Sequence, residues 1–221
     1  MNLFKIESKV QIFMLIVLFL VIFLAGNQKL SAKEDYNWNQ LKQRYKYYLS
    51  HKSDISQKSL LEILPKEEVT NLKDADDTID YIFNNFAILE EGAKAGDLDT
   101  INILVRLRRI TDGANSEYIS ILLGKIIAVH PEVFLMSLKE NLDNITRLDS
   151  LLCNLGPKYV DKIYKQTEEL ERRYLALREV DNKSLAKVKD LALYILSKEI
   201  SRNRINIIYI NYDQELLNKV N

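Results

Sequence analysis

The sequence contains very little of the two residue types that interrupt helices and make turns. Its 221 residues include six glycines and three prolines, roughly a third of the usual combined share in globular domains. Sandwiches, barrels and propellers need a turn about every ten residues, and glycine or proline usually makes it. The scarcity therefore argues against those fold classes and predicts an all-α fold.

Cysteine and histidine are scarce as well. The single cysteine, Cys153, excludes an intramolecular disulfide and any metal site built from several cysteines. Leucines at positions 151, 152 and 155 surround it, so we expect a buried and inert thiol. Only two histidines, His51 and His130, are present for zinc chemistry. We predict no metal and no cofactor.

The first 32 residues have the pattern of an export leader. Lys5 and Lys9 precede the almost entirely apolar run Val10–Ala25. Its roughly 16 residues approach the roughly 20 of a membrane-spanning helix, so the pattern fits a cleaved signal peptide or a retained anchor. Asn27 stands where a lipobox needs its acceptor cysteine, which excludes lipidation there. In either case we expect the rest of the chain outside the cytoplasmic membrane, in the periplasm, in the medium or anchored facing outward.

The charge balance of the remaining chain is close to neutral. Residues 1–32 hold three basic and one acidic side chain, which leaves 28 basic and 30 acidic residues after the leader. Such a balance argues against nucleic acid as the main partner. We expect contact with a membrane only through residues 10–25, if the leader is retained.

Apolar residues recur at helical spacing along most of the chain. We expect between about seven and nine helices, joined by turns of two to five residues that place successive helices antiparallel. The expected helices cover residues 36–49, 59–64, 77–96, 98–111, 119–127, 131–138, 148–155, 157–179, which is the longest, and 185–202. Asp97 and Pro131 are suited to begin two of them, and Gly92 and Gly124 indicate close crossings between helices.

Pairs of these helices have the length of a helical-hairpin repeat. In outline only, the chain resembles stacked HEAT-type repeats, so an irregular α-solenoid is expected, with a closed multi-helix bundle as the alternative. We divide the chain into a leader (1–32), N-terminal helices with a polar linker (33–76), a main helical domain (77–202) and a C-terminal tail (203–221).

The C-terminal tail departs from the helical pattern. Residues 203–212 are rich in β-branched and aromatic side chains, which favours extended backbone. We expect a packed extended segment or a continuation of the preceding helix, followed by a short helix after Asp213. An exposed edge strand that recruits a partner is the alternative.

Three groups of polar residues could carry chemistry. Acidic residues cluster at positions 74, 76, 77 and 80, but Ile79 and Asn85 replace the glycine and glutamate that an EF-hand loop needs there. We expect these carboxylates to lie in an ordinary first helical turn. Arg106 and Arg109 are expected on a solvated helix face, with Arg108 turned away by about 100° per residue. His130 is expected to pack or cap at a helix end.

Aromatic residues gather directly after the leader, at positions 36, 38, 45, 47 and 48. Three of the five fall on the apolar helix face, so core packing is the main expectation. The candidate partner surface consists of Tyr36, Trp38, Tyr47, Arg106 and Arg109, because tyrosine, tryptophan and arginine are enriched where proteins bind each other.

The sequence contains no recognisable catalytic motif. We therefore expect a non-enzymatic exported helical protein, of bacterial type, that binds another protein or serves as a scaffold in the cell envelope. An immunity or inhibitor protein that neutralises a toxin or an envelope enzyme is one alternative. A helical enzyme or small-molecule binder is the other.

Overall fold

A computed structural model describes residues 36–65, 69, 75–111, 113–142 and 147–220, with side chains to residue 212. The chain divides into two units, Met1–Tyr36 and Asn37–Asn221, and the fold described here is that of the second. The described residues form α-helices and short 3-10 turns and contain no strand, which confirms the all-α prediction. None of the helices in these ranges is long and apolar enough to span a membrane. The predicted leader lies outside the described residues.

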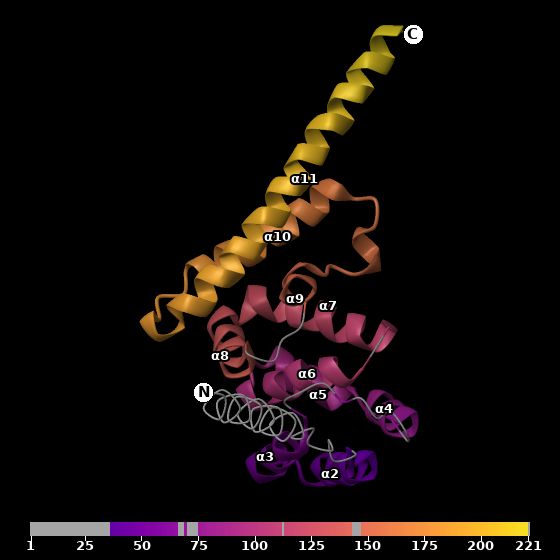
Figure 1. Ribbon diagram of the computed structural model, residues 1–221, viewed down its shortest axis with the longest axis vertical. Coiled ribbons are helices and arrows are strands. Elements are labelled where there is room, and N and C mark those ends of the chain that lie inside the picture. Colours follow the sequence, from indigo (N-terminus) through magenta and orange to yellow (C-terminus); the bar gives the residue numbers. More distant parts are fainter. Residues whose placement is uncertain (1–35, 66–68, 70–74, 112, 143–146, 221) are drawn as a thin grey trace, which may run out of the picture. The chain divides into compact units, whose positions relative to one another are not determined.

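Ten α-helices and two 3-10 turns make up this part of the chain (Figure 1). They are α2 (Trp38–His51), α3 (Asp54–Ile63), α4 (Ala75–Asn84), α5 (Ala87–Lys94), α6 (Leu98–Ile110), α7 (Gly113–Val129), α8 (Pro131–Asn141), α9 (Leu148–Cys153), η2 (Pro157–Tyr159), α10 (Ile163–Arg178), η3 (Lys183–Leu185) and α11 (Ala186–Val220).

Helices α6 and α7 lie at the centre of the packing. Helix α6 contacts α3, α5, α7 and α8, and α7 contacts α5, α6, α8, α9 and α10. Nine of the 13 residues of α6 are buried, and the apolar stripe of residues 119, 122, 123, 126 and 127 on α7 is buried as predicted. Asp97 caps α6 through its side chain, and Pro131 occupies the first turn of α8, also as predicted.

The single helix predicted over residues 77–96 is instead two helices, α4 and α5. The break falls at Asn85 and Phe86, whose amides bond to carbonyls three residues back. The hydroxyl of Tyr45 donates a hydrogen bond of 2.8 Å to the Asn85 carbonyl. Because this donor comes from a buried side chain of α2, the break has a tertiary cause that helical spacing alone does not reveal.

The predictions for the last helices were wrong in two places. The helix expected over 157–179 begins only at Ile163, and Val160, which lies inside the expected range, is 61% exposed. The longest helix among the described residues is α11 and not the helix expected over 157–179. It continues through residues 203–212, so of the two forms expected there the helix continuation is confirmed and the extended segment is not. Contacts with neighbouring α10 favour the helix, since tertiary contacts override local β-propensity.

Side chains on α10 hold α11 in its helical form along this segment. The Tyr164 hydroxyl donates to Asn211 Oδ1 at 2.7 Å, and Arg204 pairs with Glu171 at 2.7 Å. The two helices run antiparallel, side by side (Figure 1). Ile200 and Asn203 remain buried, so α11 stays in contact with the core beyond Glu199.

The two glycines inside helices mark close crossings, as predicted. A Cβ at Gly92 would lie 2.7 Å from Thr100 Oγ1 of α6. A Cβ at Gly124 of α7 would lie 2.5 Å from the guanidinium nitrogens of Arg173 on α10. Only the absence of a side chain lets these groups approach so closely.

His130 packs at a helix end, also as predicted. Its Nε2 lies 2.9 Å from the carbonyl oxygen of Lys94, the last residue of α5. Its ring occupies the space where a Cβ of Gly96 would lie, and Gly96 itself has a φ of +78°. Glycine is therefore required at position 96 both for its backbone conformation and for contact with the imidazole.

Arg173 is the largest fully buried side chain in the described part of the chain, with 1% of its surface exposed. Its Nη1 donates to the carbonyl oxygens of Leu152 at 2.7 Å and Asn154 at 3.0 Å, and Nε lies 3.4 Å from Glu169 Oε1. Burial lowers the pKa of the guanidinium, and Glu169 opposes that effect. Arg173 thus joins α10 to the end of α9 while it packs on α7.

We predict that Arg173→Met lowers the free energy of unfolding by about 3 kcal/mol, because two buried carbonyls lose their donor. Arg172→Met is the matched control, since Arg172 also bonds Glu169 but is exposed. It is expected to cost less than about 1 kcal/mol. Urea denaturation of both variants measures the difference, and equal losses would contradict the structural role of Arg173.

Candidate functional site

The five residues of the candidate partner surface occupy different environments. Trp38 is 2% exposed and Tyr36 is half-buried, whereas Tyr47 is 44% exposed and stacks on the His51 ring at 4.2 Å between centroids. Arg106 and Arg109 are half-buried on α6. The structure thus exposes Tyr47 while it places Trp38 in the core.

The prediction that the aromatic group packs mainly in the core is confirmed. Trp38, Tyr45 and Tyr48 of α2 are buried. Burial raises the pKa of the Tyr45 phenol well above its ordinary value, and the nearby phenols of Tyr48 and Tyr81 raise it further. The Tyr45 hydroxyl therefore stays protonated and donates a hydrogen bond within the fold.

The arginines of α6 are less exposed than the sequence predicted. Arg106 donates to the Leu61 carbonyl at 2.7 Å and to Asn141 Oδ1 at 3.1 Å, so it joins α3 and α8. Arg108, predicted to turn away from the solvated face, is buried and donates to Ser120 Oγ at 2.7 Å. Desolvation lowers the pKa of both guanidiniums. The solvated face expected for Arg106 is replaced by contacts between helices.

The acidic cluster is only partly described, because Asp74 lies outside the described residues. Asp77 pairs with Lys42 of α2 at 2.5 Å. Among the residues that the structure describes, no three histidine, cysteine or acidic side chains gather closely enough to hold a metal ion.

A groove with a volume of about 770 Å³ lies between α9 and α11. Helix α9 and its flanks provide one wall, and successive turns of α11 provide the other. The wall of α9 consists of Arg147, Asp149, Ser150, Cys153 and Asn154, and that of α11 of Tyr194, Ile195, Lys198, Glu199, Ser201, Arg202 and Ile205. We call this feature the α9–α11 groove.

The α9–α11 groove combines apolar and charged groups. Tyr194 and Ile205 are large apolar side chains that remain exposed. Arg202 and Glu199 form an ion pair on α11, while Arg147 and Lys198 add two positive charges against Asp149. The α11 wall therefore mixes apolar and charged side chains, and the lining as a whole has one more basic than acidic residue.

Arg147 has a strained backbone at one end of the groove. Its φ of +57° places a non-glycine residue in the left-handed region, directly before α9. Such a conformation costs about 1–2 kcal/mol and is often found where proteins bind ligands. Arg147 is both the residue directly before α9 and part of the groove wall.

Cys153 lies at the wall of the groove and is half-buried, not fully buried as predicted. Burial, with a smaller contribution from Glu199, raises the pKa of its thiol to about 12, although Arg173 opposes the shift. A thiol with such a pKa is almost entirely protonated at neutral pH. This agrees with the prediction of an inert side chain.

Reasoning from the sequence missed the α9–α11 groove, although a signal for it exists. Residues 191, 194, 205, 208 and 212 of α11 are apolar or aromatic at spacings that fit one helix face. That face lies opposite the buried stripe formed by residues 192, 196, 200 and 203. A second stripe becomes visible only once residues 203–212 are known to be helical.

No known protein family matches the chain, and no curated protein or solved structure shows significant similarity to it.

We predict that Cys153 reacts slowly with a thiol reagent in the native protein. With a pKa near 12, its thiolate fraction at pH 8 is on the order of a hundredfold or more below that of an ordinary thiol. The rate of reaction with a chromogenic disulfide, measured at pH 8 with and without urea, tests this. Equal rates in the native and unfolded protein would show that the groove does not protect the thiol.

Proposed function

We propose that this protein is an exported, non-enzymatic helical protein that binds another protein in the cell envelope through the α9–α11 groove. The observation that carries the proposal is the pair of exposed apolar side chains, Tyr194 and Ile205, beside a groove of about 770 Å³. Large apolar side chains that line a concave surface are typical of sites that bind a partner.

The shape of the groove favours a helical segment as the bound element. Its α11 wall extends from Tyr194 to Ile205, which is about 17 Å at 1.5 Å per residue. This length corresponds to about three turns of a bound helix. The excess of Arg147 and Lys198 over Asp149 favours a partner that carries acidic residues beside its apolar stripe.

The ionisable groups of the groove fit binding better than catalysis. A nucleophilic cysteine requires a lowered pKa, whereas burial raises that of Cys153. Glu199 is paired with Arg202 and so is engaged within α11. We therefore propose a role without an enzymatic reaction.

We further infer that the helices stack as an irregular array of the solenoid kind. Most contacts join helices that are near each other in the sequence. Helix α2 packs on α3 and α4, whereas α11 packs on α8, α9 and α10. Such nearest-neighbour packing is typical of solenoids and presents a lateral groove to a partner.

A small-molecule ligand is the second candidate for the groove. A volume of about 770 Å³ lies within the roughly 300–1,000 Å³ of small-molecule sites. A ligand of this kind would raise the melting temperature of the purified protein by mass action.

We predict that a photo-crosslinking amino acid at position 194 captures a protein partner in the cells that export this chain. The same amino acid at position 47, also an exposed tyrosine, is the control and is expected to give no such adduct. Lys198→Glu should reduce the adduct at least about tenfold, because it reverses a charge at the rim. Lys187→Glu, an exposed site on the same helix outside the groove, should leave it unchanged.

Adducts of equal yield from positions 47 and 194 would count against the groove as the binding site. A ligand-dependent rise in melting temperature without any protein adduct would favour the small-molecule candidate instead.

A further inference from the structure

We propose that two copies of this chain associate through the C-terminal part of α11, antiparallel, with a two-fold axis between residues 208 and 209. The surface involved consists of Ile205, Ile208, Tyr209 and Tyr212, which we call the α11 stripe. This inference goes beyond the proposed function, because it concerns a second copy of the chain, although Ile205 belongs to both surfaces.

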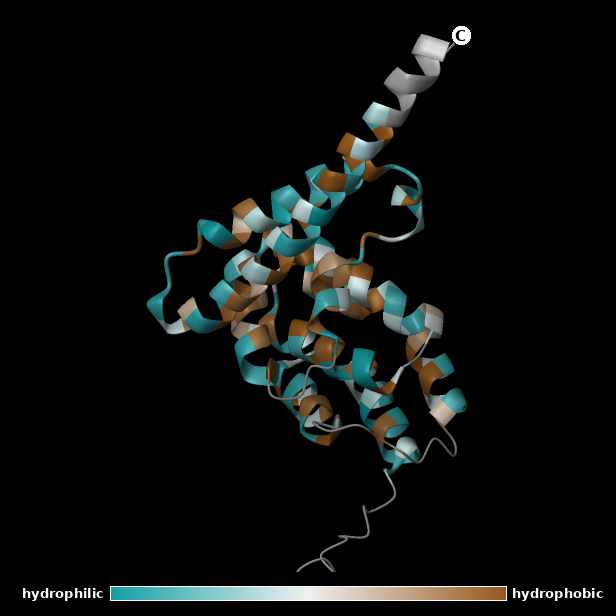
Figure 2. Ribbon diagram, turned by 45° about the horizontal axis from the view of Figure 1, so that its top comes forward, coloured by the Kyte–Doolittle hydropathy of each residue, from teal (hydrophilic) through white to brown (hydrophobic). Residues whose placement is uncertain are grey.

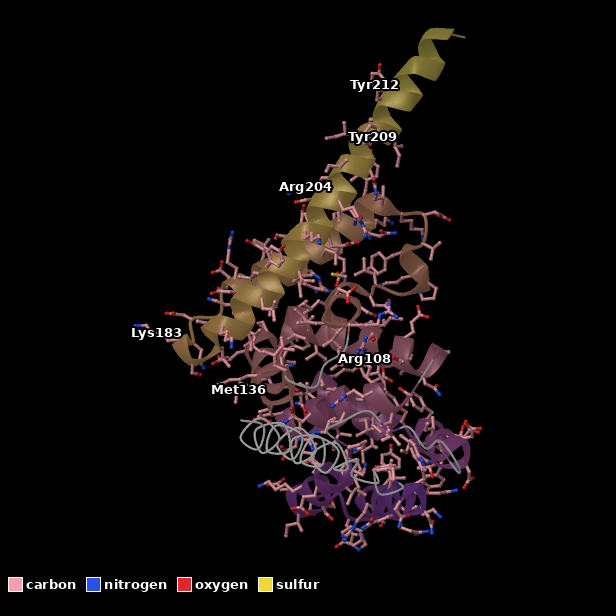
Figure 3. All side chains as sticks on the ribbon, in the orientation of Figure 1. Arg108, Met136, Lys183, Arg204, Tyr209 and Tyr212 are labelled. Atoms are coloured by element: carbon pink, nitrogen blue, oxygen red, sulfur yellow. The ribbon has the colours of Figure 1, made fainter. Side chains whose placement is uncertain are left out.

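The α11 stripe is exposed and apolar. Ile208 and Tyr209 are each 66% exposed, and Ile205 and Tyr212 are exposed to a similar degree. Figure 2 shows apolar residues continuing along α11 towards its C-terminal end, and Figure 3 shows Tyr209 and Tyr212 projecting from the side of that helix. At about 100° per residue the four side chains share one face, opposite buried Ile200 and Asn203.

The spacing of the α11 stripe makes it complementary to itself. Its four positions are separated by three, one and three residues, so the pattern is the same in both directions. In an antiparallel pair, Ile205 lies opposite Tyr212 of the second copy and Ile208 lies opposite its Tyr209. Every isoleucine thus meets a tyrosine. A two-fold interface requires this reciprocity, since the same patch is used by both subunits.

The charges along α11 have the same symmetry. Residues 205–212 carry no charge, Arg202 and Arg204 precede them, and positions 213 and 215 are acidic in the sequence. On the helical backbone, position 213 shares a flank of the stripe with position 202, and position 215 shares the other flank with position 204.

In a two-fold antiparallel pair each flank faces the same flank of the other copy. Basic positions of one copy therefore meet acidic positions of the second on both sides of the stripe. A parallel pair would place equal charges side by side, which disfavours that arrangement. The charge pattern thus points to a second copy in one orientation.

The α9–α11 groove extends past this interface. With the axis between residues 208 and 209, position 220 of the second copy lies opposite position 197. Tyr194 and Ile195 are then beyond the overlap of the two helices. A dimer can therefore form while the part of the groove next to these residues stays accessible.

Sedimentation of the purified exported chain tests the association. We expect a mass of two chains at micromolar concentrations. Ile208→Glu should weaken the dimer at least tenfold, because it places a charge at the centre of an apolar contact. Ile55→Glu, at an isoleucine of α3 that is also exposed, is the matched control and should leave the dimer intact. Circular dichroism verifies that both variants remain helical.

Disulfide trapping tests the orientation, in a Cys153→Ser background. A mixture of Ile205→Cys and Tyr212→Cys chains should form the mixed disulfide in preference to either like pair. A monomer at all concentrations would overturn the proposal, as would preferential Ile205→Cys pairing with itself. Crosslinking at position 194 measures partner binding, whereas sedimentation and disulfide trapping measure the dimer. Failure of the dimer and failure of partner binding are therefore distinguishable.

Discussion

The buried guanidinium of Arg173 is the contact on which the C-terminal half of this fold depends. It donates to carbonyls at the end of α9 while it lies against Gly124 of α7. A charge this deeply buried is tolerated because its donors are used and Glu169 lies beside it. Since α9 forms one wall of the α9–α11 groove, the position of that wall follows from how Arg173 holds the end of α9.

Helix α11 has two faces with different uses. One face is buried along α10 and is secured by Lys189, Arg204 and Asn211. The other face exposes Tyr194 near the groove and Tyr209 in the α11 stripe. Folding requires only the buried apolar face of α11, yet the helix has a second, exposed apolar face. Both the proposed binding site and the proposed dimer contact lie along this exposed face.

How far the sequence predicts this structure depends on how local each signal is. The cap at Asp97, the start at Pro131 and the apolar stripe of α7 are set by nearby residues, and each could be predicted. The helix break at Asn85 and the helical state of residues 203–212 depend on side chains of other helices. Helical spacing and β-propensity carry no information about such partners.

The candidate site was harder to predict than the fold for a related reason. Helical spacing of apolar residues does not mark Arg173 as a core residue, yet its side chain is buried. An arginine side chain is buried only where acceptors such as carbonyl oxygens of another helix bond its N–H groups. The sequence does not show where those oxygens lie. The α9–α11 groove, which borders this contact, was therefore not visible beforehand.

The hydrogen bonds between helices also bear on how quickly the chain folds. Tyr164 and Asn211 are 47 positions apart, Glu132 and Asn182 are 50 apart, and Arg173 bonds carbonyls about twenty positions before it. Contacts that bridge 47 or 50 positions are long-range, so the loops that they close cost more entropy than the closing of a helical hairpin. Helices that are neighbours in the sequence, such as α2 and α3, are expected to pack first, and the bonds between distant helices form after them.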